Sequence, residues 1–263
     1  MPSVERVRHE SRFRLLSVAA AEELTPALRR ILFEGDLADF HSAGADDHGK
    51  LFFPSEGSTR LPQPQTGGPT GLQWPEDEPR PPARDYTPRR FDSGSIVVDF
   101  VLHGDGPAAS WARSAAPGDV IGQGGPRGSR VVSDDFDWYL LAGDEAAIPA
   151  IGRRLEELPA GATAIVLVEI ASARERFGFE TRAELDLRWL ERGEAPAGST
   201  QLLDEAIAGL SLDGDGYAWV AAEADTARRL RSHLRTDRGL RQEWTRVTGY
   251  WKLGTADWHD PPE

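Results

Sequence analysis

The periodicity of this chain changes once, at the acidic run Ser133-Asp134-Asp135-Phe136-Asp137. Before this run, short apolar stretches are separated by turn residues, which is typical of antiparallel strands. After it, apolar strands alternate with helical segments, which predicts a mostly parallel sheet with helices on both faces. We therefore expect two domains, residues 1–134 and residues 135–263.

The first half of the chain is predicted to form an antiparallel six-stranded barrel, closed or nearly closed, with one helix near Pro107. Between its third and fourth strands, residues 55–82 are rich in Pro, Gly, Gln and Thr and are expected to form a long loop of the kind that is often functional. The expected strands are Phe13–Ala19, Leu28–Phe33, Lys50–Phe53, Arg84–Arg89, Ser95–Leu102 and a last strand that starts at Gly118.

The second half is predicted to be an α/β domain. Ala164–Ile170 is continuously apolar, as is typical of a strand that is buried on both faces. The other expected strands are Tyr139–Ala142, Glu184–Leu190 and Tyr217–Ala222, and the expected helices are Ala147–Leu158, Gln201–Leu210 and Thr226–Leu234.

Composition excludes several classes of function. The formal net charge of −13 argues against nucleic acid and anionic membranes as partners, because both attract basic surfaces. The chain has no cysteine, which excludes disulfides, thiolate metal sites and thiol nucleophiles. No apolar run has the length of a bilayer span or of a signal peptide core, so we expect a cytoplasmic protein without membrane insertion.

One strand of the first half carries a motif with a chemical interpretation, Arg84-Asp85-Tyr86-Thr87-Pro88. Side chains alternate along a strand, so Arg84 and Tyr86 are expected on one face. There a guanidinium can pair with a pyrophosphate and a phenol can stack on an isoalloxazine. Pro88 cannot donate to a ladder, so the strand should end at Thr87, whose hydroxyl can turn to a flavin ring nitrogen. The motif therefore predicts a flavin site.

A second segment favours a phosphate contact at the start of the helix near Pro107. His103 and Gly104 follow a strand, and Gly106 precedes Pro107, which suits the first position of a helix. Exposed amides at a helix start attract phosphate. Alone, this segment is an ordinary strand, turn and helix; together with the Arg84 strand it predicts a second contact to the same pyrophosphate.

Three further segments have both a structural and a functional interpretation. Asp46-Asp47-His48 is better explained as a polar turn before a strand than as a metal site, although it would also suit a polar pocket beside a flavin. The turn at residues 124–130 carries Arg127 and Arg130, which could face an anionic ligand. Gly249-Tyr250-Trp251-Lys252 pairs two aromatic residues with a positive charge, and such a pair either completes a core or covers a cofactor.

Asp144 and Glu145 follow the first strand of the second half, where ligands bind in α/β sheets. Acidic residues at a helix start are also ordinary caps, and no Gly-x-Gly-x-x-Gly fingerprint is present here. Nicotinamide binding would therefore be of the looser ferredoxin-reductase kind.

Taken in order, these segments resemble the siderophore-interacting protein family of flavin-dependent ferric-siderophore reductases, within the ferredoxin-reductase-like superfamily. The resemblance spans nearly the whole chain. It departs from the common family pattern at Ala146, Ala222 and Lys252. The matching segments are Asp46–Pro54, Arg84–Arg89, His103–Ala112, Pro117–Asp119, Gly125–Ser129, Leu141–Ala150 and Gly249–Gly254.

The resemblance implies an N-terminal FAD-binding barrel, a C-terminal domain of the NAD(P)H-binding type, and a basic pocket for an anionic ferric siderophore. The cofactor contacts that we expect are Arg84, Tyr86, Thr87, His103, Gly106, Ala108, Ser110, Trp111, Asp144, Glu145, Tyr250 and Trp251. The substrate contacts that we expect are Lys50, Arg127, Arg130 and Lys252.

The mechanism expected from the resemblance runs from NADH or NADPH through FAD to Fe(III) in the bound siderophore, with ferredoxin as an alternative donor. The chemistry belongs to the cofactor, so no catalytic side chain and no metal ligand of the protein is expected. Two alternatives remain open, namely a general flavin reductase with another acceptor and a carrier that binds siderophore without turnover.

Overall fold

The computed structural model describes residues 1–55, 57–58, 60–66, 72–255, 258 and 260. The chain forms two compact units. We call Arg6–Val131 the half-barrel unit, and Val132–Glu263 together with Met1–Glu5 the α/β unit. Among the described residues, no helix has the length and apolar character needed to cross a membrane.

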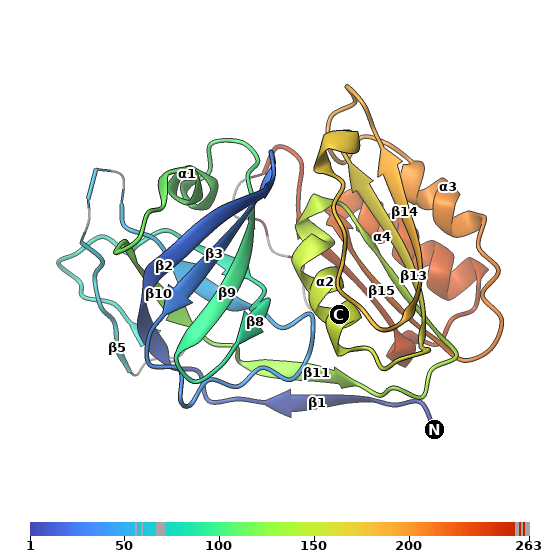
Figure 1. Cartoon of the computed structure of the whole chain (residues 1–263), viewed down its shortest axis with the longest axis horizontal. Helices are drawn as coiled ribbons and strands as arrows, with labels where there is room; N and C mark the ends of the chain where they lie inside the picture. Colours follow the sequence, from blue (N-terminus) through green and yellow to red (C-terminus); the bar gives the residue numbers. More distant parts are fainter. Residues whose placement is uncertain (56, 59, 67–71, 256–257, 259, 261–263) are drawn as a thin grey trace. The chain divides into compact units, whose positions relative to one another are not determined.

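The half-barrel unit is built on a curled antiparallel sheet of seven strands in the order β7-β4-β10-β2-β3-β9-β8 (Figure 1). Two further pairs of strands, β1 with β11 and β5 with β6, form small separate sheets. The elements are β1 (Val4–Arg8), β2 (Phe13–Thr25), β3 (Leu28–Glu34), β4 (Gly49–Phe52), β5 (Gln65–Thr66), β6 (Leu72–Gln73), β7 (Ala83–Tyr86), β8 (Arg90–Phe91), β9 (Ser95–Val101), α1 (Pro107–Ser114), β10 (Val120–Gly124) and β11 (Gly128–Val132).

Alternation along the strands places one apolar face of this sheet in a common core. Phe33 on β3 and Phe100 on β9 are fully buried, and their rings lie 6.3 Å apart. Trp111 of α1 stacks on Phe33 with ring centroids 6.1 Å apart, so α1 closes one side of the core. Large aromatic side chains thus hold the helix against the sheet.

The structure confirms the predicted fold class but corrects the strand count from six to seven. Arg90–Phe91 forms β8, although its two exposed residues resemble part of the turn that follows. The strand at Gly118 was predicted to be the last of this half, but β11 follows it. Part of the predicted long loop, residues 56, 59 and 67–71, lies outside the described residues, and β5 and β6 lie within that loop.

The α/β unit contains a five-stranded parallel sheet in the order β14-β13-β12-β15-β16. This order agrees with the alternation of strands and helices in the second half of the chain. The elements are β12 (Trp138–Gly143), η1 (Glu145–Ala147), α2 (Ile148–Glu157), β13 (Thr163–Ile170), η2 (Ala173–Glu175), β14 (Glu184–Glu191), α3 (Leu202–Ala208), β15 (Gly216–Glu223), α4 (Ala224–Ser232), η3 (His233–Asp237), η4 (Gln242–Trp244) and β16 (Thr245–Trp251).

Helices cover both faces of this sheet. Helices α3 and α4 pack on the face that carries Leu140, Ala218 and Val220, and α2 lies on the opposite face (Figure 1). The connection from β12 to β13 therefore runs on one side, and the connection from β15 to β16 runs on the other. Because β12 and β15 are neighbours, their carboxyl ends form the topological switch point at which open α/β sheets bind ligands.

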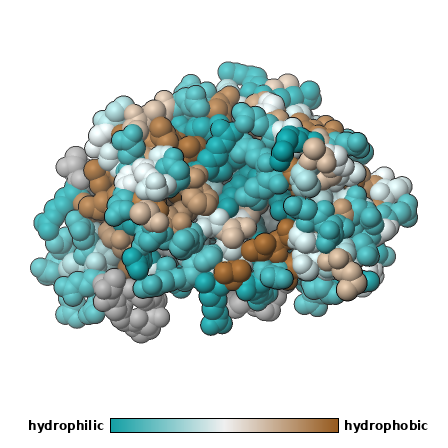
Figure 2. Space-filling model, turned by 60° about the horizontal axis from the view of Figure 1, so that its bottom comes forward, coloured by the Kyte–Doolittle hydropathy of each residue, from teal (hydrophilic) through white to brown (hydrophobic). Residues whose placement is uncertain are grey.

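Hydrophilic side chains cover most of the surface shown in Figure 2, and hydrophobic ones form smaller patches between them. This distribution agrees with the mean hydropathy of −0.46 and the formal net charge of −13.

Gly143 ends β12 at the switch point, where there is no room for a side chain. A Cβ at this position would lie 2.0 Å from the carbonyl oxygen of Ala221 on β15 and 2.4 Å from the Cβ of Ala147. We expect Gly143→Ala to push β12 and β15 apart and to lower the free energy of unfolding by about 2–3 kcal/mol. Urea denaturation of the purified variant measures this loss.

The matched control is Gly178→Ala in the same unit, where a Cβ would meet nothing within 4 Å. This substitution should change the free energy of unfolding by less than about 0.5 kcal/mol. Equal effects of the two substitutions would show that the contact at Gly143 relaxes without cost.

Candidate functional site

Strand β7 carries the first part of the candidate site in the half-barrel unit. Arg84 lies opposite Leu51 of β4, and Tyr86 lies opposite Gly49, so Arg84 and Tyr86 share one face of the sheet. The Tyr86 ring lies 4.4 Å from the ring of Phe100, and Arg84 donates a hydrogen bond to the carbonyl of Ala83 at 2.7 Å. Burial raises the pKa of Tyr86 well above its ordinary value, although the charge of Arg84 opposes this shift. The phenol therefore stays protonated.

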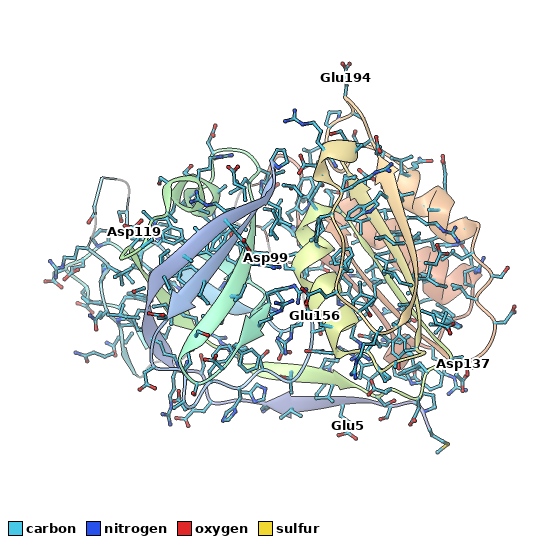
Figure 3. The ribbon with its side chains drawn as sticks, in the orientation of Figure 1. Glu5, Asp99, Asp119, Asp137, Glu156 and Glu194 are labelled. Atoms are coloured by element: carbon cyan, nitrogen blue, oxygen red, sulfur yellow. The ribbon has the colours of Figure 1, made fainter. Side chains whose placement is uncertain are left out.

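The segment that follows β7 is anchored firmly to β9. The Arg89 amide donates to the carbonyl of Val97 at 2.8 Å, and the Arg89 guanidinium lies 3.7 Å from the carboxylate of Asp99. Asp99, labelled in Figure 3, is 2% exposed and also accepts two hydrogen bonds from Arg30, at 2.7 and 2.8 Å. The hydrogen bond from Arg30 to Asp99 raises the pKa of Arg30, so the guanidinium stays charged.

This anchoring fixes Thr87, which is mostly buried. Among the described residues, none hydrogen-bonds to the Thr87 hydroxyl. A hydroxyl that is held in place without a protein partner is available to a bound ligand.

Helix α1 supplies the second part of the candidate cofactor site. Its N-cap is Gly106, which has no side chain to satisfy the first helical amides, and Pro107 follows it. The preceding turn contains Gly104 with φ of +55°. Of the other predicted contacts, Ala108 is buried, Ser110 is exposed, and Trp111 is half-buried in the core. The helix start is therefore suited to an anion such as a phosphate.

A cavity of about 380 Å³ lies in the same unit. Three basic side chains line it, namely Lys50 from β4, Arg80 from the long loop and Arg127 from the turn between β10 and β11. The Lys50 Nζ atom lies 3.0 Å from both carboxylate oxygens of Asp85. The full lining is Ser11, His48, Lys50, Phe52, Leu72, Arg80, Asp85, Gly124, Gly125, Arg127 and Gly128.

The buried carboxylate of Asp47 joins the two segments that line this cavity at His48 and Gly128. Its Oδ2 atom accepts hydrogen bonds from the Ser42 hydroxyl at 2.8 Å, the Gly44 amide at 3.1 Å and the Ser129 hydroxyl at 2.5 Å. The Ser129 hydroxyl also lies 2.6 Å from the His9 Nε2 atom. The turn before Lys50 is thereby held against the strand that follows Arg127.

The structure brings together two of the four predicted substrate contacts. Lys50 and Arg127 line the cavity, whereas Arg130 lies on β11 and is not among the lining residues. Lys252 follows β16 in the α/β unit, where it forms a bridge with Thr255. Sequence reasoning missed Arg80, because nothing distinguishes it within the Pro-rich loop.

In the α/β unit, the buried carboxylate of Asp144 occupies the switch point. It accepts hydrogen bonds from the Ala146 amide at 2.9 Å, from the Glu223 amide at 3.0 Å and from the indole Nε1 of Trp251 at 2.8 Å. Asp144 therefore connects the ends of β12, β15 and β16. Burial raises the pKa of Asp144 to about 7, against the opposing effect of the Trp251 hydrogen bond.

Two more acidic side chains stand at the same edge of the sheet. Glu145 accepts hydrogen bonds from Arg192 at 2.6 Å and from the Ala171 amide at 3.0 Å. Glu223 caps α4 by accepting from the amides of Asp225 and Thr226. The other predicted aromatic residue, Tyr250, lies edge-on to Trp219 with ring centroids 6.2 Å apart. Asp144, Glu145 and Trp251 thus share this edge, and their hydrogen bonds hold the edge together.

The raised pKa of Asp144 gives a prediction with a definite sign. The folded chain binds this proton more tightly than the unfolded chain, so the contribution of Asp144 to stability falls as the pH rises from about 4 to about 7. The quantity to compare is the free energy of unfolding of the wild type minus that of Asp144→Asn at the same pH. This difference should fall by roughly 2–3 kcal/mol between pH 5 and pH 8. Urea denaturation of both proteins across this range measures it, and a constant difference would contradict the raised pKa.

Each of the two units matches a known protein family model. A family model described as siderophore-interacting FAD-binding domain matches residues 17–130, and a model described as siderophore-interacting protein matches residues 136–254. A protein of Escherichia coli (strain K12) named NADPH-dependent ferric-chelate reductase is 35% identical over 254 residues, which cover 94% of this chain and 96% of that protein. Ferric vibriobactin reductase ViuB of Vibrio cholerae is 31% identical, over 92% of this chain and 90% of that protein.

Solved structures of siderophore-related proteins also match this chain over nearly its whole length. A siderophore utilization protein from T. fusca is 33% identical with a TM-score of 0.85, over 98% of this chain and 99% of that one. The siderophore-interacting protein SipS from Aeromonas hydrophila is 28% identical with a TM-score of 0.76, over 93% of each chain. A flavohemoglobin from Malassezia yamatoensis, 9% identical with a TM-score of 0.60 over 93% of this chain and 61% of that one, shares the fold alone. The chain belongs to the siderophore-interacting protein family.

Proposed function

We propose that this protein is an FAD-dependent reductase that uses electrons from a reduced nicotinamide to reduce Fe(III) in a bound siderophore and release Fe(II). The observation that carries the proposal is the cavity lined by Lys50, Arg80 and Arg127, one wall of which is formed by Asp85 of β7. The same strand carries Arg84 and Tyr86 of the flavin motif. A cationic substrate pocket and a flavin motif thus share one strand.

The residues of the half-barrel unit fit FAD. Arg84 offers a guanidinium for the pyrophosphate, and Thr87 offers a hydroxyl that has no protein partner among the described residues. The start of α1, with Gly106 as its N-cap, offers backbone amides for a phosphate, with His103, Ala108, Ser110 and Trp111 around it. When bound, FAD supplies the conversion of a two-electron hydride donor into single electrons for iron.

The cavity fits an anionic chelate rather than a bare metal ion. Ammonium and guanidinium groups do not ligate iron, so they would hold the complex through the anionic oxygens of the siderophore. A volume of about 380 Å³ suits a small ligand. A local cluster of positive charge attracts such an anion even though the whole chain carries a net charge of −13. We further propose that Arg130 and Lys252 contribute charge to substrate binding.

The switch point of the α/β unit suits the nicotinamide donor. We propose that residues 1–134 hold FAD and residues 135–263 the donor, with Asp144 and Glu145 fixing the sheet edge and Tyr250 and Trp251 covering the cofactor. The name of the Escherichia coli relative supports NADPH. Ferredoxin is the alternative donor, and we propose that the reaction takes place in the cytoplasm.

The test begins with the absorbance spectrum of the purified protein. NADPH or NADH is then added without oxygen, followed by a ferric siderophore and a ferrous-iron trap. The proposal expects flavin bands that bleach with the nicotinamide and recover as ferrous iron appears. A flavoprotein that reduces quinones but not ferric siderophores would be a general flavin reductase. A protein that binds no FAD but binds the ferric chelate would be a carrier.

Arg84 should determine flavin affinity. Arg84→Ala removes a charge-assisted contact to the pyrophosphate, which is worth about 1.5–3 kcal/mol. The dissociation constant for FAD should therefore rise about 10- to 100-fold, as measured by fluorescence titration of the stripped protein. The control is Arg8→Ala, at an exposed arginine of β1 in the same unit, which should leave FAD affinity unchanged. Equal FAD affinity in the two variants would remove Arg84 from the flavin site.

A further inference from the structure

The positive charge of the cavity is reduced by a single carboxylate. Of the described residues that line the cavity, Lys50, Arg80 and Arg127 carry positive charge, and Asp85 alone carries a carboxylate. Arg80 has neither an ion pair nor a hydrogen bond with any other described residue. Lys50, by contrast, is paired with Asp85. A ligand that enters the cavity therefore meets Lys50 in an ion pair with Asp85.

The pairing of Asp85 with Lys50 follows from the register of the sheet. The two residues lie directly opposite each other on β7 and β4, so their side chains leave the sheet on the same face. The Lys50 Nζ atom is 3.0 Å from each carboxylate oxygen, and the two side chains remain 35% and 32% exposed. The carboxylate is thus accessible to a ligand in the cavity.

The Asp85 side chain does not lie on the face of β7 that carries the flavin motif. Its neighbours Arg84 and Tyr86 lie on the opposite face, because side chains alternate along β7. The carboxylate of Asp85 therefore acts on whatever enters the cavity. Its repulsion of an anion grows with the negative charge of that anion, so the effect differs among ferric complexes.

We propose that Asp85 is a specificity-determining residue that lowers the affinity of the cavity for the most strongly charged ferric complexes. Iron(III) bound by catecholate dianions at all six positions is triply negative, whereas iron(III) bound by three hydroxamates is neutral. Asp85 opposes the first class and hardly affects the second, so the cavity accepts siderophores of both classes rather than catecholates alone. This inference rests on the proposed function of the cavity.

The experiment measures binding, not turnover. The full chain as purified, without an electron donor, is placed in equilibrium dialysis against a ferric tris-catecholate or a ferric tris-hydroxamate, and the bound iron is counted. Asp85→Asn removes the charge and keeps an acceptor for Lys50, and Asp85→Ser provides a second neutral variant. Asp85→Glu keeps the charge. Glu23→Gln, at an exposed position of β2 outside the cavity, changes the net charge by the same amount.

In Asp85→Asn and Asp85→Ser, the affinity for the triply negative complex should increase on the order of tenfold. The affinity for the neutral complex should change less than about twofold. Added salt should reduce this difference, because it screens partly exposed charges. Asp85→Glu and Glu23→Gln should bind both complexes as the wild type does.

Equal changes for the two complexes, or weaker binding of both, would overturn the inference, because they would show that Asp85 only positions Lys50. In that case the proposed function would stand, since the wild type still binds ferric siderophores. A wild-type protein that binds neither complex would instead overturn the proposed function and the inference together.

Discussion

The candidate substrate cavity depends on one buried carboxylate, that of Asp47. Its Oδ2 atom accepts three hydrogen bonds, from Ser42, from the Gly44 amide and from Ser129, and these donors come from two segments far apart in the sequence. One segment leads into β4 with Lys50, and the other follows Arg127. A buried carboxylate is costly unless its hydrogen bonds are made, so the loops are held at the geometry that makes them. The positions of two basic side chains of the cavity follow from this.

In the α/β unit, the buried carboxylate of Asp144 likewise holds separate segments of the chain together. Asp144 receives hydrogen bonds from the ends of three structural elements at the carboxyl edge of the parallel sheet, including the indole of Trp251. Asp144 and Glu145, which the sequence predicts as cofactor contacts because they are acidic and follow a strand, are thus structural in part. Their hydrogen bonds make the sheet edge rigid, which suits the proposed nicotinamide site. The proposed chemistry remains with FAD, while the chain supplies charge, orientation and shape.

Much of this organisation could be predicted from the sequence, because it follows from local rules. β7 ends at Tyr86, one residue before the end at Thr87 that Pro88 predicts, and the apolar run at Ala164–Ile170 forms most of the buried strand β13. The elements that were missed are those that tertiary contacts create. Arg90–Phe91 is too short and exposed to be distinguished from a turn, and β11 follows a turn that resembled the end of the barrel. Arg80 lies in a loop without periodicity, so only the folded chain shows that it lines the cavity.

The alternation of side chains along β7 separates two kinds of evolutionary pressure. Arg84 and Tyr86 on one face would have to suit the proposed cofactor, whereas Asp85 between them faces the cavity and would have to suit the proposed substrate. Mutation at the middle position can then change the choice of siderophore while the flavin face stays intact. If the cavity has the proposed function, a lineage that acquires iron from a new source would not need a new protein, because a single codon of β7 alters the cavity side of the strand and leaves its flavin side unchanged.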